Sequence, residues 1–166
     1  MFAARVFRWA SVSIIALCLA MPMSLQAQNS TAVDDLRTQA QAALSRGQPE
    51  EAISLLRRAI DQAPDRADLY MLRSRARDSS GKFDAALEDA SKYIQLEPQD
   101  AYGYINRARV YQSLEKNDQA LADANKAIEL APEDPDGYYR RADIYSVMGK
   151  KAESKADEAK AEALDK

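Results

Sequence analysis

Residues 101–134, AYGYINRARVYQSLEKNDQALADANKAIELAPED, decide the fold of this chain. The first half carries Tyr104 and Tyr111 two helical turns apart, and the second half places small and apolar residues at helical spacing from Ala120 onwards. Pro132 then ends the second half, because a proline lacks the backbone N–H that a helix interior needs. The stretch therefore predicts two helices joined by a short turn.

The same arrangement recurs every 34 residues. Three residue types keep this spacing: Pro64, Pro98 and Pro132; Tyr70, Tyr104 and Tyr138; Ala52, Ala86 and Ala120. The turn between the two helices has a glycine in three units, at Gly47, Gly81 and Gly149, whereas the third unit has Glu115. We therefore divide the chain into four units, at 33–66, 67–100, 101–134 and 135–166.

Each unit has a large residue early in its first helix and a small one four positions later. These residues are Leu36, Tyr70, Tyr104 and Tyr138, followed by Ala40, Ser74, Ala108 and Ala142. Together with the alanine that opens the second helix and the closing proline, this pattern resembles the tetratricopeptide repeat (TPR) family over residues 33–166. The resemblance implies an all-α, right-handed helical-repeat solenoid of about four TPR helix pairs. It also implies that the first helix of each pair lines a concave groove.

Composition excludes several classes of site. The 166 residues include 31 alanines, no histidine and a single cysteine, Cys18. A Ser-His-Asp triad, a Cys-His pair and a His/Cys metal site therefore cannot form. The net charge of −3 argues against nucleic-acid binding, which usually needs a basic excess. We expect no catalytic residues, no metal and no cofactor; an enzyme with an unrecognised site is the least favoured alternative.

Residues 1–27 have the three-part pattern of a secretory signal peptide. Arg5 and Arg8 precede an apolar run over 9–21, and the segment ends in the small residue Ala27. This pattern predicts export, to the periplasm of a bacterial cell. Two alternatives stay open: an uncleaved membrane anchor, and lipid attachment at Cys18, which is preceded by a large residue where a lipobox has a small one. Membrane contact is expected only through an uncleaved segment.

The domain organisation that follows is a signal peptide at 1–27, a short linker at 28–32 and a repeat domain at 33–166. Thr31, with Asp34 three residues later, resembles a capping box. This pattern predicts that the first helix of the domain begins there.

Two sets of charged residues share the repeat period. Arginines stand at Arg73, Arg107 and Arg141, and aspartates stand 16 residues later at Asp89, Asp123 and Asp157. The first unit has an uncharged residue in both places, so the two charges appear together and disappear together. We predict a structural Arg–Asp pair that links the two helices of each of the other units.

The groove that the TPR resemblance implies would receive residues at fixed positions after the repeated tyrosine. One and five positions after it, these are Arg37, Gln41, Met71, Arg75, Ile105, Arg109, Tyr139 and Asp143. Tyr102, Asn106 and Arg140 are expected near the edges of the groove. Because Arg107 is assigned to Asp123, Arg109 is expected to be free, and with Arg75 and Arg140 it would suit an extended peptide that carries carboxylates. Alternatively, these arginines are solvated or pair with Asp136 or Asp143. If Arg109 is exposed, Arg109→Glu should leave folding intact.

Some TPR proteins hold a partner's terminal carboxylate with a clamp of Lys, Asn and Arg residues. Asn106 and Arg140 match part of that clamp, whereas Met71, Arg75 and Asp136 stand at its remaining positions and do not match. We therefore do not transfer that ligand. The sequence predicts a non-catalytic scaffold or adaptor of the bacterial cell envelope that binds another protein or peptide; a self-associating structural component, forming a homo-oligomer, is the alternative.

Overall fold

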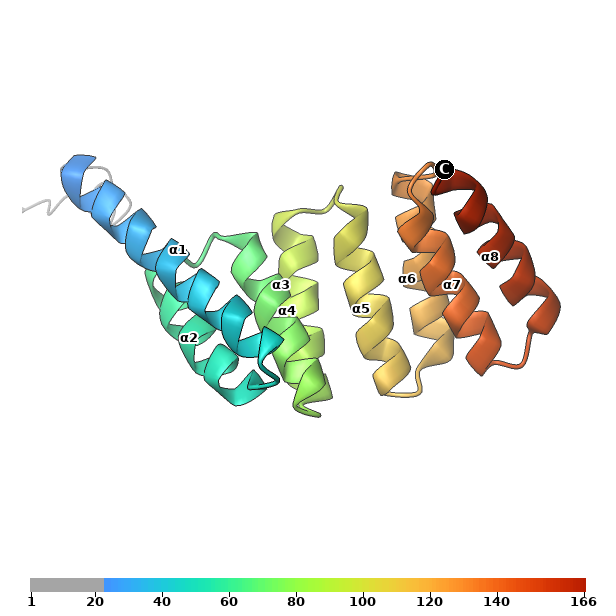
Figure 1. Cartoon of the computed structure of the whole chain (residues 1–166), viewed down its shortest axis with the longest axis horizontal. Coiled ribbons are helices and arrows are strands. Elements are labelled where there is room, and N and C mark those ends of the chain that lie inside the picture. Colours follow the sequence, from blue (N-terminus) through green and yellow to red (C-terminus); the bar gives the residue numbers. More distant parts are fainter. Residues whose placement is uncertain (1–22) are drawn as a thin grey trace, which may run out of the picture.

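The computed structural model describes residues 23–166. These residues form eight helices and no strand. The helices are α1 (Met23–Ser45), α2 (Pro49–Gln62), α3 (Ala67–Ser79), α4 (Phe83–Leu96), α5 (Ala101–Ser113), α6 (Asn117–Leu130), α7 (Pro135–Val147) and α8 (Lys151–Leu164). Figure 1 shows them as a row of helix pairs from α1/α2 at one end to α7/α8 at the other.

The two helices of each pair pack against each other, and each even-numbered helix also packs on the odd-numbered helix that follows it. Every helix of the row therefore has its main contacts with its neighbours in the chain. This is the arrangement of a repeat protein, in which each unit is stabilised mainly by the next one. The predicted all-α helical-repeat solenoid of about four helix pairs is confirmed.

Small side chains make the close packing of the helices possible. Ala52, Ala86 and Ala120, which open the second helix of three units, are each fully buried. Ser74 has the corresponding role in α3, where its hydroxyl donates a hydrogen bond to the carbonyl oxygen of Ala86 at 2.9 Å. Because these positions are closed to solvent between packed helices, a larger side chain there would have to displace a neighbouring helix.

The turn inside each pair needs a residue in the left-handed backbone region. Gly47, Gly81 and Gly149 have φ angles of 71°, 74° and 75°, and Glu115 has a φ of 58°. A residue with a Cβ is strained in this region, by about 1–2 kcal/mol. The third unit therefore forms the same turn as the others with Glu115 in place of a glycine.

Helix α5 lies directly against Tyr93 of α4. A Cβ atom added at Gly103 would lie only 2.7 Å from Cδ1 of the Tyr93 ring, so glycine is needed for this approach. The Tyr93 hydroxyl donates a hydrogen bond to Asp100. Asp100 in turn caps α5, since its carboxylate accepts a hydrogen bond from the backbone N–H of Tyr102 at 2.9 Å. Tyr93 is thus held at the start of α5.

The N-terminal boundary differs from the expectation. Helix α1 begins at Met23 and runs through residues 28–32, so these residues are helical and do not form a linker. Thr31 lies inside α1 and is not its N-cap, because no proline or glycine separates Met23 from Val33 and nothing local ends the helix there. The signal-peptide, anchor and Cys18 lipidation hypotheses depend on 1–22, which lie outside the described residues. Within residues 23–166, no helix is both long and apolar enough to cross a membrane.

Candidate interaction groove

The odd-numbered helices form the inner, concave layer of the stack. Helix α1 contacts α3, α3 contacts α5 and α5 contacts α7, whereas the even-numbered helices of residues 23–166 make no such contacts with one another. A row of helix pairs whose members approach on one side only must curve toward that side. All the residues predicted for the groove lie on these odd-numbered helices.

Three depressions lie on this layer among the described residues. The first, of about 190 Å³, lies between α5 and α7 and is lined by Tyr102, Ile105, Asn106, Arg109, Asp136, Tyr139, Arg140 and Asp143. The second, of about 270 Å³, is lined by Gln41, Leu44, Ser45, Leu72, Arg75, Ser79 and Arg109. The third, of about 260 Å³, is lined by Arg37, Gln41, Asp68, Met71, Leu72, Arg75, Tyr93 and Tyr102.

The three depressions are connected through shared walls. Arg109 lines the first and second, Arg75 the second and third, and Tyr102 the first and third. We call this continuous surface, with all the residues just given, the groove. It extends across all four repeats and includes every residue that the sequence had placed there. Tyr93 was not predicted, since it comes from an even-numbered helix and reaches the groove past Gly103.

Three of the predicted groove residues form its floor. Met71, Ile105 and Asn106 are only 5%, 8% and 4% exposed. Both ends of the Asn106 amide are hydrogen-bonded, because its Nδ2 donates to Ser74 Oγ at 3.0 Å and its Oδ1 accepts from Arg109 at 3.0 Å. Tyr102, by contrast, is 42% exposed and is the main aromatic surface that the groove offers.

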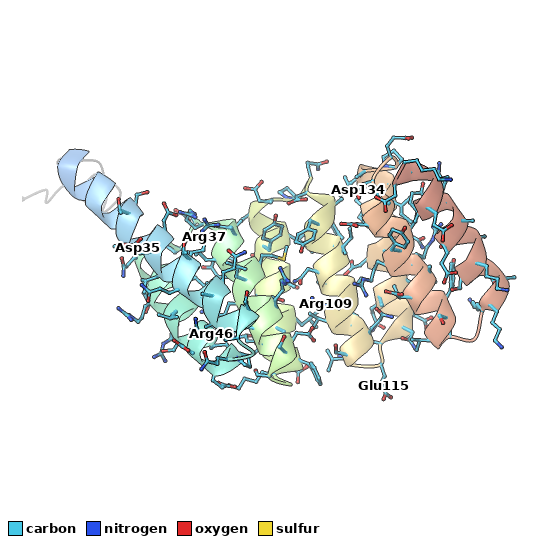
Figure 2. All side chains as sticks on the ribbon, in the orientation of Figure 1. Asp35, Arg37, Arg46, Arg109, Glu115 and Asp134 are labelled. Atoms are coloured by element: carbon cyan, nitrogen blue, oxygen red, sulfur yellow. The ribbon has the colours of Figure 1, made fainter. Side chains whose placement is uncertain are left out.

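Arg109 is not free, contrary to the expectation. Its Nε lies 3.1 Å from Oδ2 of Asp78 on α3, and the Asp78 carboxylate also accepts a hydrogen bond from Ser113 Oγ at 2.9 Å. Figure 2 shows Arg109 on the side of α5 that faces α3. Burial lowers the pKa of Arg109 from its usual value, although Asp78 acts in the opposite direction. No repeated pattern pointed to this contact, because Asp78 has no counterpart in the other repeats.

The remaining groove arginines differ in how far their charge is compensated. Arg140 donates to Gln112 at 3.1 Å and lies 3.3 Å from Asp143, as the alternative interpretation had it. Arg37 lies 3.7 Å from Asp68. Arg75 is exposed and has no ion pair or side-chain hydrogen bond with any of residues 23–166. Arg75 is thus the arginine whose full charge faces the groove.

The three periodic Arg–Asp sets lie away from the groove, between the two helices of each pair. Arg73, Arg107 and Arg141 each donate two hydrogen bonds, of 2.7–2.8 Å, to Asp89, Asp123 and Asp157 respectively. Each guanidinium also lies 5.6–5.8 Å from the ring centre of the repeated tyrosine. The Asp123 hydrogen bonds raise the pKa of Arg107. The first repeat lacks both charges and has an apolar core instead.

Arg141 also reaches the preceding repeat, where its Nη1 donates to Asn125 Oδ1 at 2.8 Å. The guanidinium of Arg141 therefore joins three consecutive helices, α6, α7 and α8. In the second repeat Asp89 has a second arginine partner, since Arg77 lies 2.8 Å from its carboxylate. No group of acidic side chains in residues 23–166 is arranged to hold a metal ion.

Comparison with known families gives three matches, each described as a tetratricopeptide repeat. They cover residues 37–101, 101–134 and 124–160. A comparison with curated proteins gives no significant match.

Solved structures with a similar fold include MamA, with a TM-score of 0.70 and 21% identity over 86% of this chain and 83% of that one. The Arabidopsis OM64 TPR domain has a TM-score of 0.66 and 22% identity over 71% of this chain and 98% of that one. The first TPR domain of Spaghetti (RPAP3), bound to the HSP90 peptide SRMEEVD, has a TM-score of 0.66 and 22% identity over 72% of this chain and 95% of that one. At these identities the likeness concerns the fold.

Proposed function

This chain belongs to the tetratricopeptide repeat family, and we propose that it is a non-catalytic interaction scaffold that holds an extended segment of a partner protein in its groove. The observation that carries this proposal is the continuity of the groove. Its depressions share Arg75, Arg109 and Tyr102, so one ligand can contact all four repeats.

The dimensions of the groove favour an extended chain. Packed helices lie about 8–10 Å apart, so the four odd-numbered helices span about 30 Å. An extended peptide advances about 3.3 Å per residue and would need about nine residues for that length. The exposed ring of Tyr102 offers apolar contact to its side chains, and the guanidinium of Arg75 offers donors to its carboxylates or backbone carbonyls. The similarly folded RPAP3 domain binds a seven-residue peptide, which supports the proposal.

We further propose that the protein works in the cell envelope, because of the signal-like pattern at residues 1–27. The test is to fractionate cells that produce the full chain and to sequence the N-terminus of the recovered protein. Recovery from the periplasm with a new N-terminus at residue 28 would support export and cleavage. Recovery of the intact chain from the cytoplasm would contradict the proposal.

Binding is tested by capturing partners from an envelope extract with the tagged protein and two variants. Arg75→Glu reverses the uncompensated charge in the groove, and Arg58→Glu makes the same change at an exposed position of α2 that lines none of the depressions. Arg109 is left intact because of its contact with Asp78.

We expect a partner that the native protein and Arg58→Glu retain and Arg75→Glu loses. Equal recovery by all three would exclude the groove as the binding site. If no partner is retained and the native protein grows in size with concentration, self-association would replace the scaffold proposal.

A further inference from the structure

We propose that the partner segment carries an acidic side chain for Arg75 and, about six residues away, a basic side chain for Asp136 and Asp143. This inference rests on the proposed function, since it specifies which segment the groove selects. It follows from the charges of the groove that no neighbouring side chain neutralises, and from the distance between the helices that carry them.

Most charges of the groove are compensated within the protein. Arg109 pairs with Asp78 at 3.1 Å, and Arg37 lies 3.7 Å from Asp68, which also accepts hydrogen bonds from Arg66. A ligand charge placed on such a pair would gain little, because attraction to one partner is offset by repulsion from the other. The positions that can select a ligand charge are therefore those where a charged side chain has no partner of opposite charge within the protein.

One such position is Arg75 on α3. Its side chain is exposed, lines two of the three depressions and has no ionic or hydrogen-bonded partner in residues 23–166. Its positive charge also adds to the lowering of the pKa of the nearby Arg109 guanidinium, after burial as the main cause. A carboxylate bound at Arg75 would compensate this concentration of positive charge.

The opposite charge is left over at α7. Asp136 is exposed and forms no ion pair with the described residues, and Asp143, 65% exposed, lies 3.3 Å from Arg140. Two carboxylates and one guanidinium leave one negative charge on this wall of the first depression. Tyr139 lies in the same wall, and a tyrosine ring adds a favourable surface for a cation. A lysine or arginine of the partner fits this chemistry.

The two positions set the spacing of the ligand charges. Helices α3 and α7 are separated by α5 alone, which contacts both of them. Two interhelical steps make about 20 Å, the length of about six extended residues. Between them the groove offers Tyr102 and the floor residue Ile105, so the intervening ligand residues should be uncharged.

The test uses fluorescence anisotropy with the full chain and three pools of labelled decapeptides. Each pool has charged residues at positions 2 and 8 and randomised uncharged residues elsewhere. The pools carry one Glu and one Lys, two Glu, or two Lys. Since an exposed ion pair contributes up to about 1 kcal/mol, we expect the mixed pool to bind about threefold to fivefold more tightly than the other two. This preference should decrease with added salt.

Two charge reversals then assign the two ends. Arg75→Glu should shift the preference to the pool with two Lys, and Asp136→Lys should shift it to the pool with two Glu. The matched controls are Arg58→Glu and Glu133→Lys, which change exposed positions outside the depressions and should keep the preference for the mixed pool.

The outcomes distinguish the two proposals. If all pools bind the native protein equally, or if the reversals do not change the preference, the charge order is wrong while the groove remains a peptide site. If the pool with two Glu binds best to the native protein, the groove selects carboxylates at both positions, and the proposed charge order is wrong. If no pool binds at all, the proposed function itself is contradicted for short extended segments.

Discussion

Arg107 of α5 and Asp123 of α6 form a two-pronged ion pair across the third repeat, with Nε–Oδ2 and Nη2–Oδ1 distances of 2.7 and 2.8 Å. Their side chains are 22% and 9% exposed. The pair lies away from the groove, and the same geometry recurs 34 residues later at Arg141 and Asp157. We infer that it holds the two helices of a repeat at a set separation.

Removing one partner of this pair should destabilise the protein. Asp123→Ala leaves the Arg107 guanidinium with little compensation, and we expect the free energy of unfolding to fall by about 3 kcal/mol. A double-mutant cycle with Arg107→Ala, followed by urea unfolding, should give a coupling of about 2 kcal/mol. The exposed pair Lys126–Glu129 on the same helix is the control and should give about 0.3 kcal/mol. Equal couplings for the two pairs would refute the structural role.

Glu115→Gly should stabilise the protein. Glu115 has a φ of 58° in a turn where three other repeats have glycine, and its side chain projects from the turn after α5 (Figure 2). Removing the Cβ relieves left-handed strain, and we expect a gain of about 0.5–1 kcal/mol in thermal or urea unfolding. Gly81→Ala is the mirror experiment and should cost about 1 kcal/mol. A loss of stability in Glu115→Gly would mean that the Glu115 side chain has a stabilising contact.

Acid should remove the stabilisation that Asp68 provides. Hydrogen bonds from Arg66 lower the pKa of Asp68, so the folded state binds fewer protons here than the unfolded state. Its contribution is complete above the unfolded value of about 3.9 and is lost as the pH falls through the lower folded value. The stability difference between the native protein and Asp68→Asn should therefore be constant from about pH 7 to pH 5 and decrease below about pH 4.

Arg66→Gln tests the cause of this effect, because it removes the main donor to Asp68. Chemical unfolding at a series of pH values, with and without Asp68→Asn in that background, should show a smaller acid-dependent difference in stability. An unchanged difference would assign the effect to Arg37, which lies 3.7 Å from Asp68.

The sequence predicts the parts of this molecule that repeat. The 34-residue period places the helices and turns, because each unit meets the same local and nearest-neighbour requirements. What does not repeat could not be found in this way. Asp78 pairs with Arg109, although the other repeats have Leu44, Gln112 and Ser146 at the position of Asp78. Helix α1 also begins about three turns before the first repeat unit. Asn106, expected near the groove edge, lies on its floor, where it donates to Ser74 of another repeat.

Arg109→Glu should impair folding, in contrast to the expectation from the sequence. The change places a second carboxylate opposite Asp78, whose side chain is 13% exposed, and removes the donor to Asn106. Losing a hydrogen bond that a charged group donates costs about 2 kcal/mol, and we expect a decrease of at least that size in the free energy of unfolding. Arg75→Glu, at the exposed equivalent position of α3, should change it by less than about 0.5 kcal/mol. If the double variant Arg109→Glu/Asp78→Arg regains the lost stability, the contact between α3 and α5 is ionic. If Arg109→Glu and Arg75→Glu have equal effects on the free energy of unfolding, Asp78 contributes nothing to holding the two helices together.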